Sequence, residues 1–254
     1  MRRARLIPCL LLHENYLVKT VRFSKPRYIG DPINAVKLFN DLEVDELMLL
    51  DIGATQAGRE PNYQKVKEIV SEAFMPVAYG GGVKTLRHVE LLLKAGVEKV
   101  VITTAATSRI EILSEVANAI GSQSVVAGMD IRRSWLGSST VTAERARRSL
   151  ATPPVALAAA YVQAGAGELL INSVDRDGCM RGYDLAILRQ ITAAVSVPVV
   201  ACGGAGSLED VSKAIDAGAS AAAAGSLFVY KGPHRGVLIN YPSSVELATI
   251  TGNT

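Results

Sequence analysis

Two stretches of the sequence, Pro76-Val-Ala-Tyr-Gly-Gly-Gly82 and Pro198-Val-Val-Ala-Cys-Gly-Gly204, have the same design. In each, a short apolar run typical of a buried strand ends in a pair of glycines that permits a tight turn. Equivalent residues of the two stretches lie 122 positions apart, and the same separation relates Ala95-Gly96 to Ala217-Gly218, Thr104 to Ser226 and Glu46 to Glu168. One separation across these landmarks indicates two repeated halves, each of four strand–helix units.

Short apolar runs alternate with helical patterns along the rest of the chain. The expected strands are residues 5–12, 46–51, 75–79, 99–103, 124–130, 168–173, 197–202 and 220–224. The expected helices are residues 32–42, 63–73, 86–95, 110–119, 154–164, 185–195 and 208–217. This order is typical of a parallel barrel or of a doubly wound sheet. The repeat favours the barrel, so we predict an α/β fold, a (β/α)₈ TIM barrel built from two half-barrels.

We expect one domain over residues 1–254, with half-barrels at about 1–120 and 121–230 and an irregular tail from about 231. No linker or shift in composition separates the halves. Residues 13–31 are predicted to form a long loop after the first strand. The tail contains two prolines and no amphipathic period, so the eighth helix is predicted to be short or missing.

Composition excludes other classes of protein. The formal net charge is +3, too small to indicate nucleic-acid binding, and the first apolar run is too short to span a membrane. The three cysteines, at positions 9, 179 and 202, show no CxxC spacing, which favours reduced thiols in the cytoplasm. The three histidines are scattered, so we expect no metal and no cofactor.

Glycines and hydroxyl residues follow several of the expected strands, at the end of a barrel where active sites lie. Backbone N–H groups in such turns approach an anion closely, and a following helix N-terminus favours negative charge. The symmetric pair of clusters predicts two phosphate-type sites, although glycine after a strand is also common in plain structural turns. The candidate anion-binding residues are Gly81, Gly82, Thr104, Asp177, Gly178, Gly203, Gly204, Gly225 and Ser226.

The chain resembles HisF, the cyclase subunit of imidazole glycerol phosphate synthase, over roughly residues 1–230. The resemblance rests on segments in the same order along the chain, among them Arg5-Leu-Ile-Pro-Cys9, Gly80-Gly-Gly82, Thr104-Ala-Ala106, Gly121-Ser-Gln123, Gly165-Ala-Gly-Glu168, Ser173-Val-Asp-Arg-Asp-Gly178, Gly182-Tyr-Asp184 and Gly203-Gly-Ala-Gly206. The sister isomerase HisA fits these segments less well.

The resemblance implies a cyclase site with one aspartate at the end of strand 1 and another at the end of strand 5, since ring closure and cleavage need proton transfers at two positions. The strand 5 aspartate matches Asp130. The strand 1 position, two residues after Cys9, is Leu11, which cannot transfer a proton. The resemblance also assigns a supporting catalytic role to Lys19, for which a solvated surface lysine is the alternative, and we expect Asp51 to join a polar network at the mouth.

The resemblance further implies a passage for ammonia from a HisH-like glutaminase, which docks where the barrel strands begin. Its entrance is ringed by four charges, which match Arg5, Glu46, Lys99 and Glu168. The alternative is four independent charges on the rim of the barrel. Glu98 matches the residue that contacts the glutaminase.

The four entrance charges are present while the strand 1 aspartate of the cyclase site is missing. In this combination the chain resembles HisF-like proteins of surface-polysaccharide biosynthesis. That subgroup implies a subunit that passes ammonia to an ATP-dependent nucleotide-sugar amidotransferase near the barrel mouth, which forms an acetamidino sugar. Whether the chain is itself an enzyme stays open. A working cyclase, with Glu14 sharing the proton transfers, and a barrel that acts on another phosphorylated substrate are the alternatives.

Overall fold

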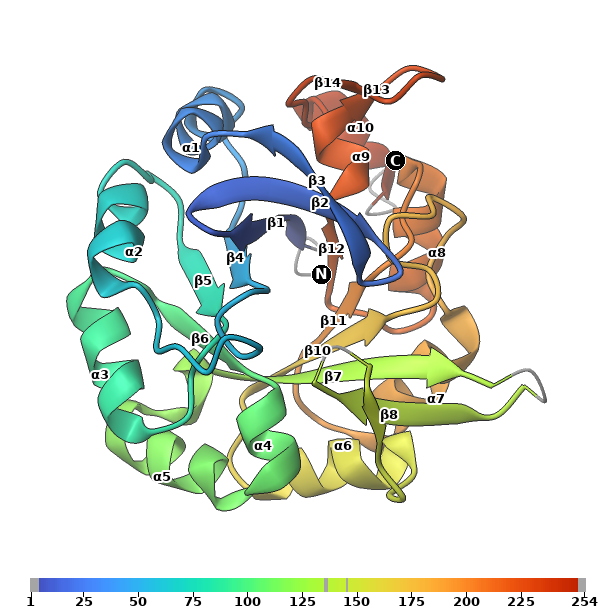
Figure 1. Ribbon diagram of the computed structural model, residues 1–254. Coiled ribbons are helices and arrows are strands. Elements are labelled where there is room, and N and C mark those ends of the chain that lie inside the picture. Colours follow the sequence, from blue (N-terminus) through green and yellow to red (C-terminus); the bar gives the residue numbers. More distant parts are fainter. Residues whose placement is uncertain (1–4, 135–136, 145, 251–254) are drawn as a thin grey trace.

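The computed structural model describes residues 5–134, 137–144 and 146–250. Eight parallel strands form a closed barrel, because each pairs with the next and the last pairs with the first (Figure 1). In barrel order they are β1 (Arg5–His13), β4 (Leu47–Asp51), β5 (Val77–Gly80), β6 (Lys99–Ile102), β7 (Val125–Arg133), β10 (Glu168–Ser173), β11 (Val199–Cys202) and β12 (Ala221–Ala224). The predicted fold class is confirmed.

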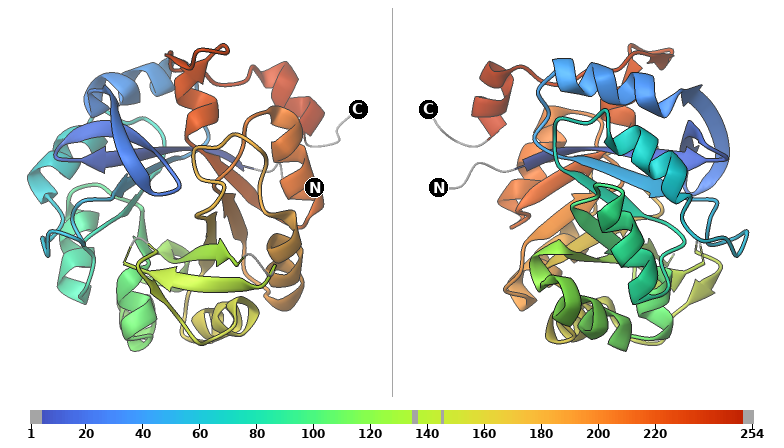
Figure 2. Two further views of the ribbon diagram at one scale, coloured as in Figure 1. Left: turned by 45° about the vertical axis from the view of Figure 1, so that its right-hand side comes forward. Right: turned by 90° about the vertical axis from the view of Figure 1, so that its left-hand side faces the viewer.

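Helices surround the barrel and connect its strands (Figures 1 and 2). They are α1 (Pro32–Asp41), α2 (Tyr63–Val70), α3 (Leu86–Lys94), α5 (Glu111–Ile120), α6 (Pro154–Gln163), α7 (Leu185–Ala194) and α8 (Leu208–Asp216). Proline occupies the first position of α1 and α6, where its missing N–H costs nothing. Asp31 caps α1 by accepting hydrogen bonds from the Ile33 and Asn34 N–H groups.

The apolar core has two parts. The larger part lies between the strands and the ring of helices. The smaller part fills the inside of the barrel, where Ile7, Cys9 and Leu11 of β1 meet inward side chains of the other strands. The inward residues of β12 are Ala221 and Ala223, which are small. The interior is therefore apolar along its length.

The two halves of the barrel share backbone geometry as well as sequence. The residue before α2, Asn62, and the residue before α7, Asp184, both have φ −80° and ψ 84°. Thr85 caps α3 and Ser207 caps α8, each by accepting a hydrogen bond from the N–H three residues later. Asn62 and Asp184, like Thr85 and Ser207, are 122 positions apart. The repeat predicted from four landmarks thus extends to the caps of the helices.

Two hairpins at the mouth of the barrel differ from the prediction. Residues 13–31, predicted as a loop, contain β2 (Tyr16–Val21) and β3 (Ser24–Gly30), which pair with each other. Their turns place Glu14, Asn15, Arg22 and Phe23 at positive φ. Three of these four residues are not types that announce such a turn, which is why the sequence hid it. Likewise β7 continues past Asp130 and pairs with β8 (Ser139–Ala143), which pairs with β9 (Arg148–Ser149).

The tail after β12 is more ordered than the sequence indicates. It contains α9 (Ser226–Val229), the two-residue strands β13 (Tyr230–Lys231) and β14 (Gly236–Val237), and α10 (Ser244–Ile250). The final helix is short, as predicted. Two further short helices, α4 (Thr104–Ser108) and η1 (Ser122–Ser124), complete the described elements. In the part of the chain that the structure describes, every helix is too short or too polar to cross a lipid bilayer.

Candidate functional site

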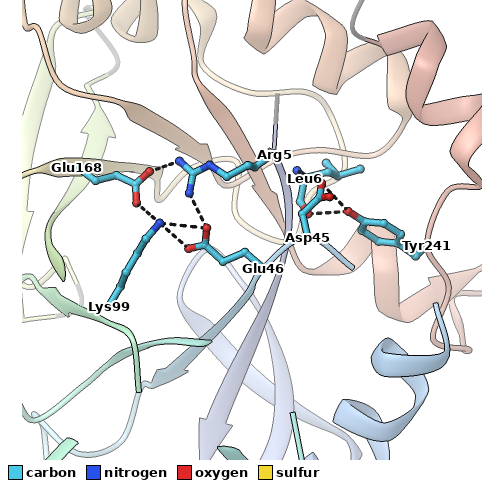
Figure 3. Close-up of polar contacts among 7 residues, drawn as sticks. All are labelled: Arg5, Leu6, Asp45, Glu46, Lys99, Glu168 and Tyr241. Atoms are coloured by element: carbon cyan, nitrogen blue, oxygen red, sulfur yellow. Dashed lines mark hydrogen bonds and ion pairs between the residues drawn. The ribbon is translucent and has the colours of Figure 1, made fainter. Parts of the chain in front are cut away.

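Four charged side chains meet inside the end of the barrel where the strands begin (Figure 3). The Arg5 guanidinium donates one hydrogen bond to Glu46 and another to Glu168. The Lys99 Nζ lies 3.1 Å from both carboxylate oxygens of Glu46 and 3.0 Å from the Glu168 Oε2. Each cation thus contacts both anions, and the alternative of four independent rim charges does not describe this arrangement. We call these four residues the charged ring.

The charged ring is partly removed from water. The two glutamate side chains are 5% exposed, and those of Arg5 and Lys99 are 29% and 23% exposed. Burial alone would lower the pKa of Arg5, but the hydrogen bonds and negative charges of Glu168 and Glu46 outweigh it and raise that pKa. Each buried carboxylate therefore has two cationic partners, which offset the cost of its burial and hold it in place. Removing any one would leave two like charges with a single partner of opposite sign.

Glu98 lies in the loop between α3 and β6, immediately before Lys99 of the charged ring, and is exposed. Its backbone N–H donates to the Val77 carbonyl, 3.0 Å away, which leaves the side chain free to face a partner. Its role in docking a glutaminase stays a prediction.

A cavity of about 570 Å³ opens at the other end of the barrel, the mouth. The structure brings together every residue predicted for this end. These are Leu11, Lys19, Asp51, Asp130, Asp177, Gly178, Ser226, Thr104 and the glycines at positions 81, 82, 203, 204 and 225, all of which line the cavity. Glu14, proposed as a substitute acid, does not line it.

Leu11 and Asp130 stand on opposite walls of the mouth, because β1 and β7 are four strands apart in the barrel of eight. Leu11 is 7% exposed and belongs to the apolar cluster inside the barrel. A leucine methyl group therefore occupies the wall that faces the carboxyl group. Of the two positions at which the predicted chemistry needs a proton-transfer group, the one on β7 carries a carboxyl group and the one on β1 does not.

Asp130 is partly exposed, to the cavity alone, and its Oδ1 accepts a hydrogen bond of 3.3 Å from the Asn172 side-chain amide. Burial raises the pKa of Asp130 to about 7, the Asn172 hydrogen bond lowers it, and the charge of Asp177 raises it further. Near neutral pH the carboxyl group thus exists in both protonation states. That is the property of a general acid or base.

Lys19 and Asp177 connect the β2–β3 hairpin to the mouth. Lys19 is 6% exposed, and its ammonium group packs against Gly225, so the alternative of a solvated surface lysine does not fit. The Asp177 Oδ2 accepts a 2.7 Å hydrogen bond from the Thr20 hydroxyl and a 3.3 Å hydrogen bond from the Phe23 N–H. The Asp177 side chain is thereby committed to holding the hairpin over the cavity.

Asp51 is used within its own turn. Its Oδ1 accepts hydrogen bonds from the Gly53 and Ala54 N–H groups, at 2.9 and 3.0 Å, just after β4 ends. This is the pattern of an aspartate that stabilises a turn. The polar network expected of Asp51 at the mouth is therefore this local set of bonds.

All four glycines of the two clusters adopt positive φ. Gly81 and Gly82 have φ values of 117° and 72°, and Gly203 and Gly204 have φ values of 83° and 122°. A Cβ at Gly81 would collide with the Asp51 carbonyl, and one at Gly203 would lie 2.6 Å from the carbonyl of Ser173, which is 122 positions after Asp51. Only glycine fits these turns. Anion binding at the two clusters stays a prediction.

Two features of the mouth were missed from the sequence. Asn172 contacts Asp130, and the signal was a lone amide side chain near the end of an apolar strand. Cys9 and Cys202 are buried and hydrogen-bond to each other across β12. That bond lowers the pKa of Cys9 and, together with burial, raises the pKa of Cys202 well above its ordinary value. Both side chains line the cavity at the mouth.

Comparison with known proteins places these features in context. The model of a family described as "Histidine biosynthesis protein" matches residues 5–234. A Pseudomonas aeruginosa protein, provisionally named imidazole glycerol phosphate synthase subunit hisF2, is 50% identical over 97% of this chain and 99% of its own length. Subunit HisF of imidazole glycerol phosphate synthase from Streptomyces coelicolor is 42% identical over 88% of this chain and 89% of its own length.

Proposed function

Because the chain belongs to the family of histidine biosynthesis proteins, we propose that it is a HisF-like subunit that conducts ammonia and has given up the cyclase reaction. The observation that carries this proposal is Leu11, which faces Asp130 across the mouth. Leucine cannot supply the second proton transfer. The charged ring, in contrast, is complete, with both glutamates contacting both cations.

The source of ammonia in this proposal is a HisH-like glutaminase docked where the barrel strands begin. Ammonia would pass the charged ring and enter an interior lined by apolar side chains such as Ile7, Val126 and Val200. A small neutral molecule crosses such an interior readily, whereas an ammonium ion loses its hydration there at high cost. The interior therefore favours transfer of NH₃.

The acceptor in this proposal is a nucleotide sugar held by an ATP-dependent amidotransferase near the mouth, on the route to an acetamidino sugar of a surface polysaccharide. The support is the resemblance of this chain to that subgroup, together with the cavity of about 570 Å³ into which the interior opens. This assembly is that of a glutamine-dependent amidotransferase in the cytoplasm.

A second candidate function is the cyclase reaction of histidine biosynthesis. The names of the relatives favour it, since they refer to imidazole glycerol phosphate synthase. Asp130 also favours it, because a pKa of about 7 suits proton transfer at neutral pH. This candidate needs another acid or base of the cavity lining, such as Lys19 or Glu144, to perform the proton transfer that Leu11 cannot.

The first experiment separates the two candidates. The purified chain is given the phosphoribulosyl formimino substrate of the cyclase and ammonium salts, and imidazole glycerol phosphate is measured. We expect none above the level of a Asp130→Asn variant, because the reaction lacks its second proton-transfer group. Turnover close to that of a working cyclase would exclude the proposed function and establish the second candidate.

The second experiment tests conduction. In a reconstituted complex with glutaminase and amidotransferase, Lys99→Ala should uncouple glutamine consumption from product amidation, because ammonia escapes through the opened ring. Lys213→Ala is the matched control, since Lys213 pairs with Glu209 on the surface of α8. Equal coupling in both variants would show that the charged ring does not gate ammonia.

A further inference from the structure

The C-terminal tail runs from one end of the barrel to the other. Near its start, the Arg235 guanidinium donates to the Gly178 carbonyl at the mouth, 3.2 Å away. Six residues later, the Tyr241 hydroxyl donates to the Leu6 carbonyl at the beginning of β1, 2.8 Å away, and lies 3.4 Å from the Asp45 Oδ2 (Figure 3). Tyr241 also packs against Phe228, with ring centroids 5.4 Å apart. The tail thus reaches the end of the barrel that holds the charged ring.

The helix α10 follows directly and lies at that same end. In the right-hand view of Figure 2 it lies on the side of the barrel where the strands begin, and it packs against α8. Leu247 of α10 is buried in the main apolar core, which fixes the helix to the barrel. Val245 is 75% exposed, on a helix with no further element over it among the described residues. The tail therefore adds surface to the end of the barrel that holds the charged ring.

That face has a consistent chemistry. The loops that lead from helices into barrel strands, residues 42–46, 71–76, 95–98, 121–124, 164–167, 195–198 and 217–220, contain neither lysine nor arginine. They contain Glu43, Asp45, Glu72 and Glu98 in addition to Glu46 of the charged ring. Phe74, in the second of these loops, is 89% exposed. Glu72 pairs with Lys37 of α1, so Glu43 and Glu98 are the exposed acids of these loops without an ion pair among the described contacts. Loops with such acids and with exposed apolar side chains at the rim complement a partner surface that is basic and partly apolar.

The tail also lies beyond the part of the chain that the family model matches. The match to the family model ends at residue 234, before Tyr241 and α10. The face around the charged ring thus combines loops of the family barrel with a segment from outside the matched region.

We propose that Tyr241 and α10 form part of the docking surface for the glutaminase subunit, and that this segment selects a glutaminase with a basic docking face. The proposal rests on the proposed function, because a partner that feeds ammonia to the charged ring must cover this face. Val245 makes apolar contact at the rim of the interface. Tyr241 fixes the loop that carries Asp45 by bonding to Asp45 and to the start of β1.

The test measures the dissociation constant of the full chain for each purified homologue of the glutaminase subunit that its genome encodes, by calorimetry at low and high salt. Val245→Asp should weaken binding about tenfold or more, because it adds a like charge to an acidic face and removes an apolar contact. Val237→Asp is the matched control. Val237 belongs to the same tail and is 46% exposed, but it lies on β14, two residues from Arg235 at the mouth.

Tyr241→Phe provides a milder variant that keeps the ring packed against Phe228. It should weaken binding by a few fold through the freed Asp45 loop, and binding of the native chain should weaken as salt is raised. Equal affinities for the Val245 and Val237 variants would overturn the role of the tail while leaving the conducting function intact. Failure of every glutaminase to bind the native chain would overturn the proposed function together with this inference.

Discussion

The two ends of the barrel are built on the same strands, but their charged side chains have different partners. On β1, inward positions alternate, so Arg5 stands at the entrance and Leu11 at the mouth. At the entrance each charge has two partners of opposite sign. At the mouth Asp130 faces a leucine. The comparison teaches that one barrel strand can carry a paired charge at one end and an apolar side chain at the other, because an apolar stretch separates the two positions.

The largest expected effect tests the entrance. Glu168→Ala removes one of the two carboxylates that contact Arg5 and Lys99. The two partly buried cations are then left close together with Glu46 as their shared partner. We expect a loss of about 3 to 5 kcal/mol in the free energy of unfolding, measured with urea. Glu46→Ala should have a similar effect, since Glu46 contacts the same two cations.

The control for this prediction is Glu115→Ala, which removes a surface pair with Arg109 in which both side chains are about half exposed. Water replaces the lost partner there, and we expect little change. If Glu168→Ala and Glu115→Ala were equally mild, the charged ring would be no more than rim charges. The contrast between the two ends would then disappear.

The next largest effect tests Asp130 at the mouth through the pH dependence of the free energy of unfolding. Burial raises the pKa of Asp130 to about 7 from an ordinary value of 3.8, so between these values the folded chain holds a proton that the unfolded chain has released. This group therefore contributes its full stability below pH 3.8, and the contribution is lost as the pH rises through 7. Asp130→Asn removes the titration and keeps the shape of the neutral acid.

The expected outcome is a stability difference that depends on pH. The Asp130→Asn variant should match the native chain near pH 4 and exceed its free energy of unfolding above pH 7, by about 4 kcal/mol at most. Urea unfolding across this pH range measures it. A constant difference between the two proteins would mean that Asp130 titrates normally. The carboxylate of Asp130 at the mouth would then have enough polar partners to offset its burial, as the carboxylates at the entrance do.

The smallest expected effect concerns the hydrogen bonds that hold the β2–β3 hairpin over the mouth. Thr20→Val removes the buried 2.7 Å hydrogen bond to Asp177 and should cost about 1.5 to 3 kcal/mol, because the acceptor is charged. Amide hydrogen exchange at Arg22 and Phe23 should accelerate with it, since both N–H groups bond to Asp177. Arg27→Ala, which removes an exposed side chain from β3 of the same hairpin, should leave exchange at these two amides unchanged.

The barrel was predictable because its signals are local and repeated. Strands such as β5 and β11 are short apolar runs that begin after a proline and are followed by glycines, and the ends of α3 and α8 carry the expected Ala-Gly pairs. The β2–β3 hairpin was not predictable, because Arg22 and Phe23 adopt positive φ without glycine or asparagine. Its stability comes from Asp177, which lies more than 150 residues away in the sequence.

The candidate site was predictable to the extent that its residues stand at strand ends. Arg5, Glu46 and Asp130 could be placed in this way, and their positions follow from the order of the strands. Their states could not be predicted. The pKa of Asp130 depends on burial in the finished cavity, and the amide of Asn172 reaches it from a neighbouring strand. Tyr241 carries no motif at all, since its contact with Leu6 depends on the path of the tail.

The caps of α3 and α8 are two copies of one structural feature within the same molecule. Thr85 and Ser207 perform the same task in equivalent backbones, yet Ser207 faces Asp210, whose carboxylate completes a capping box, while Thr85 faces His88. Any measurement at one cap therefore has a replicate in the same polypeptide, under the same solvent and temperature. The replicates differ in the capping residue, Thr85 or Ser207, and in the residue three positions on, so exchanging His88 and Asp210 between the caps would measure what the capping box contributes.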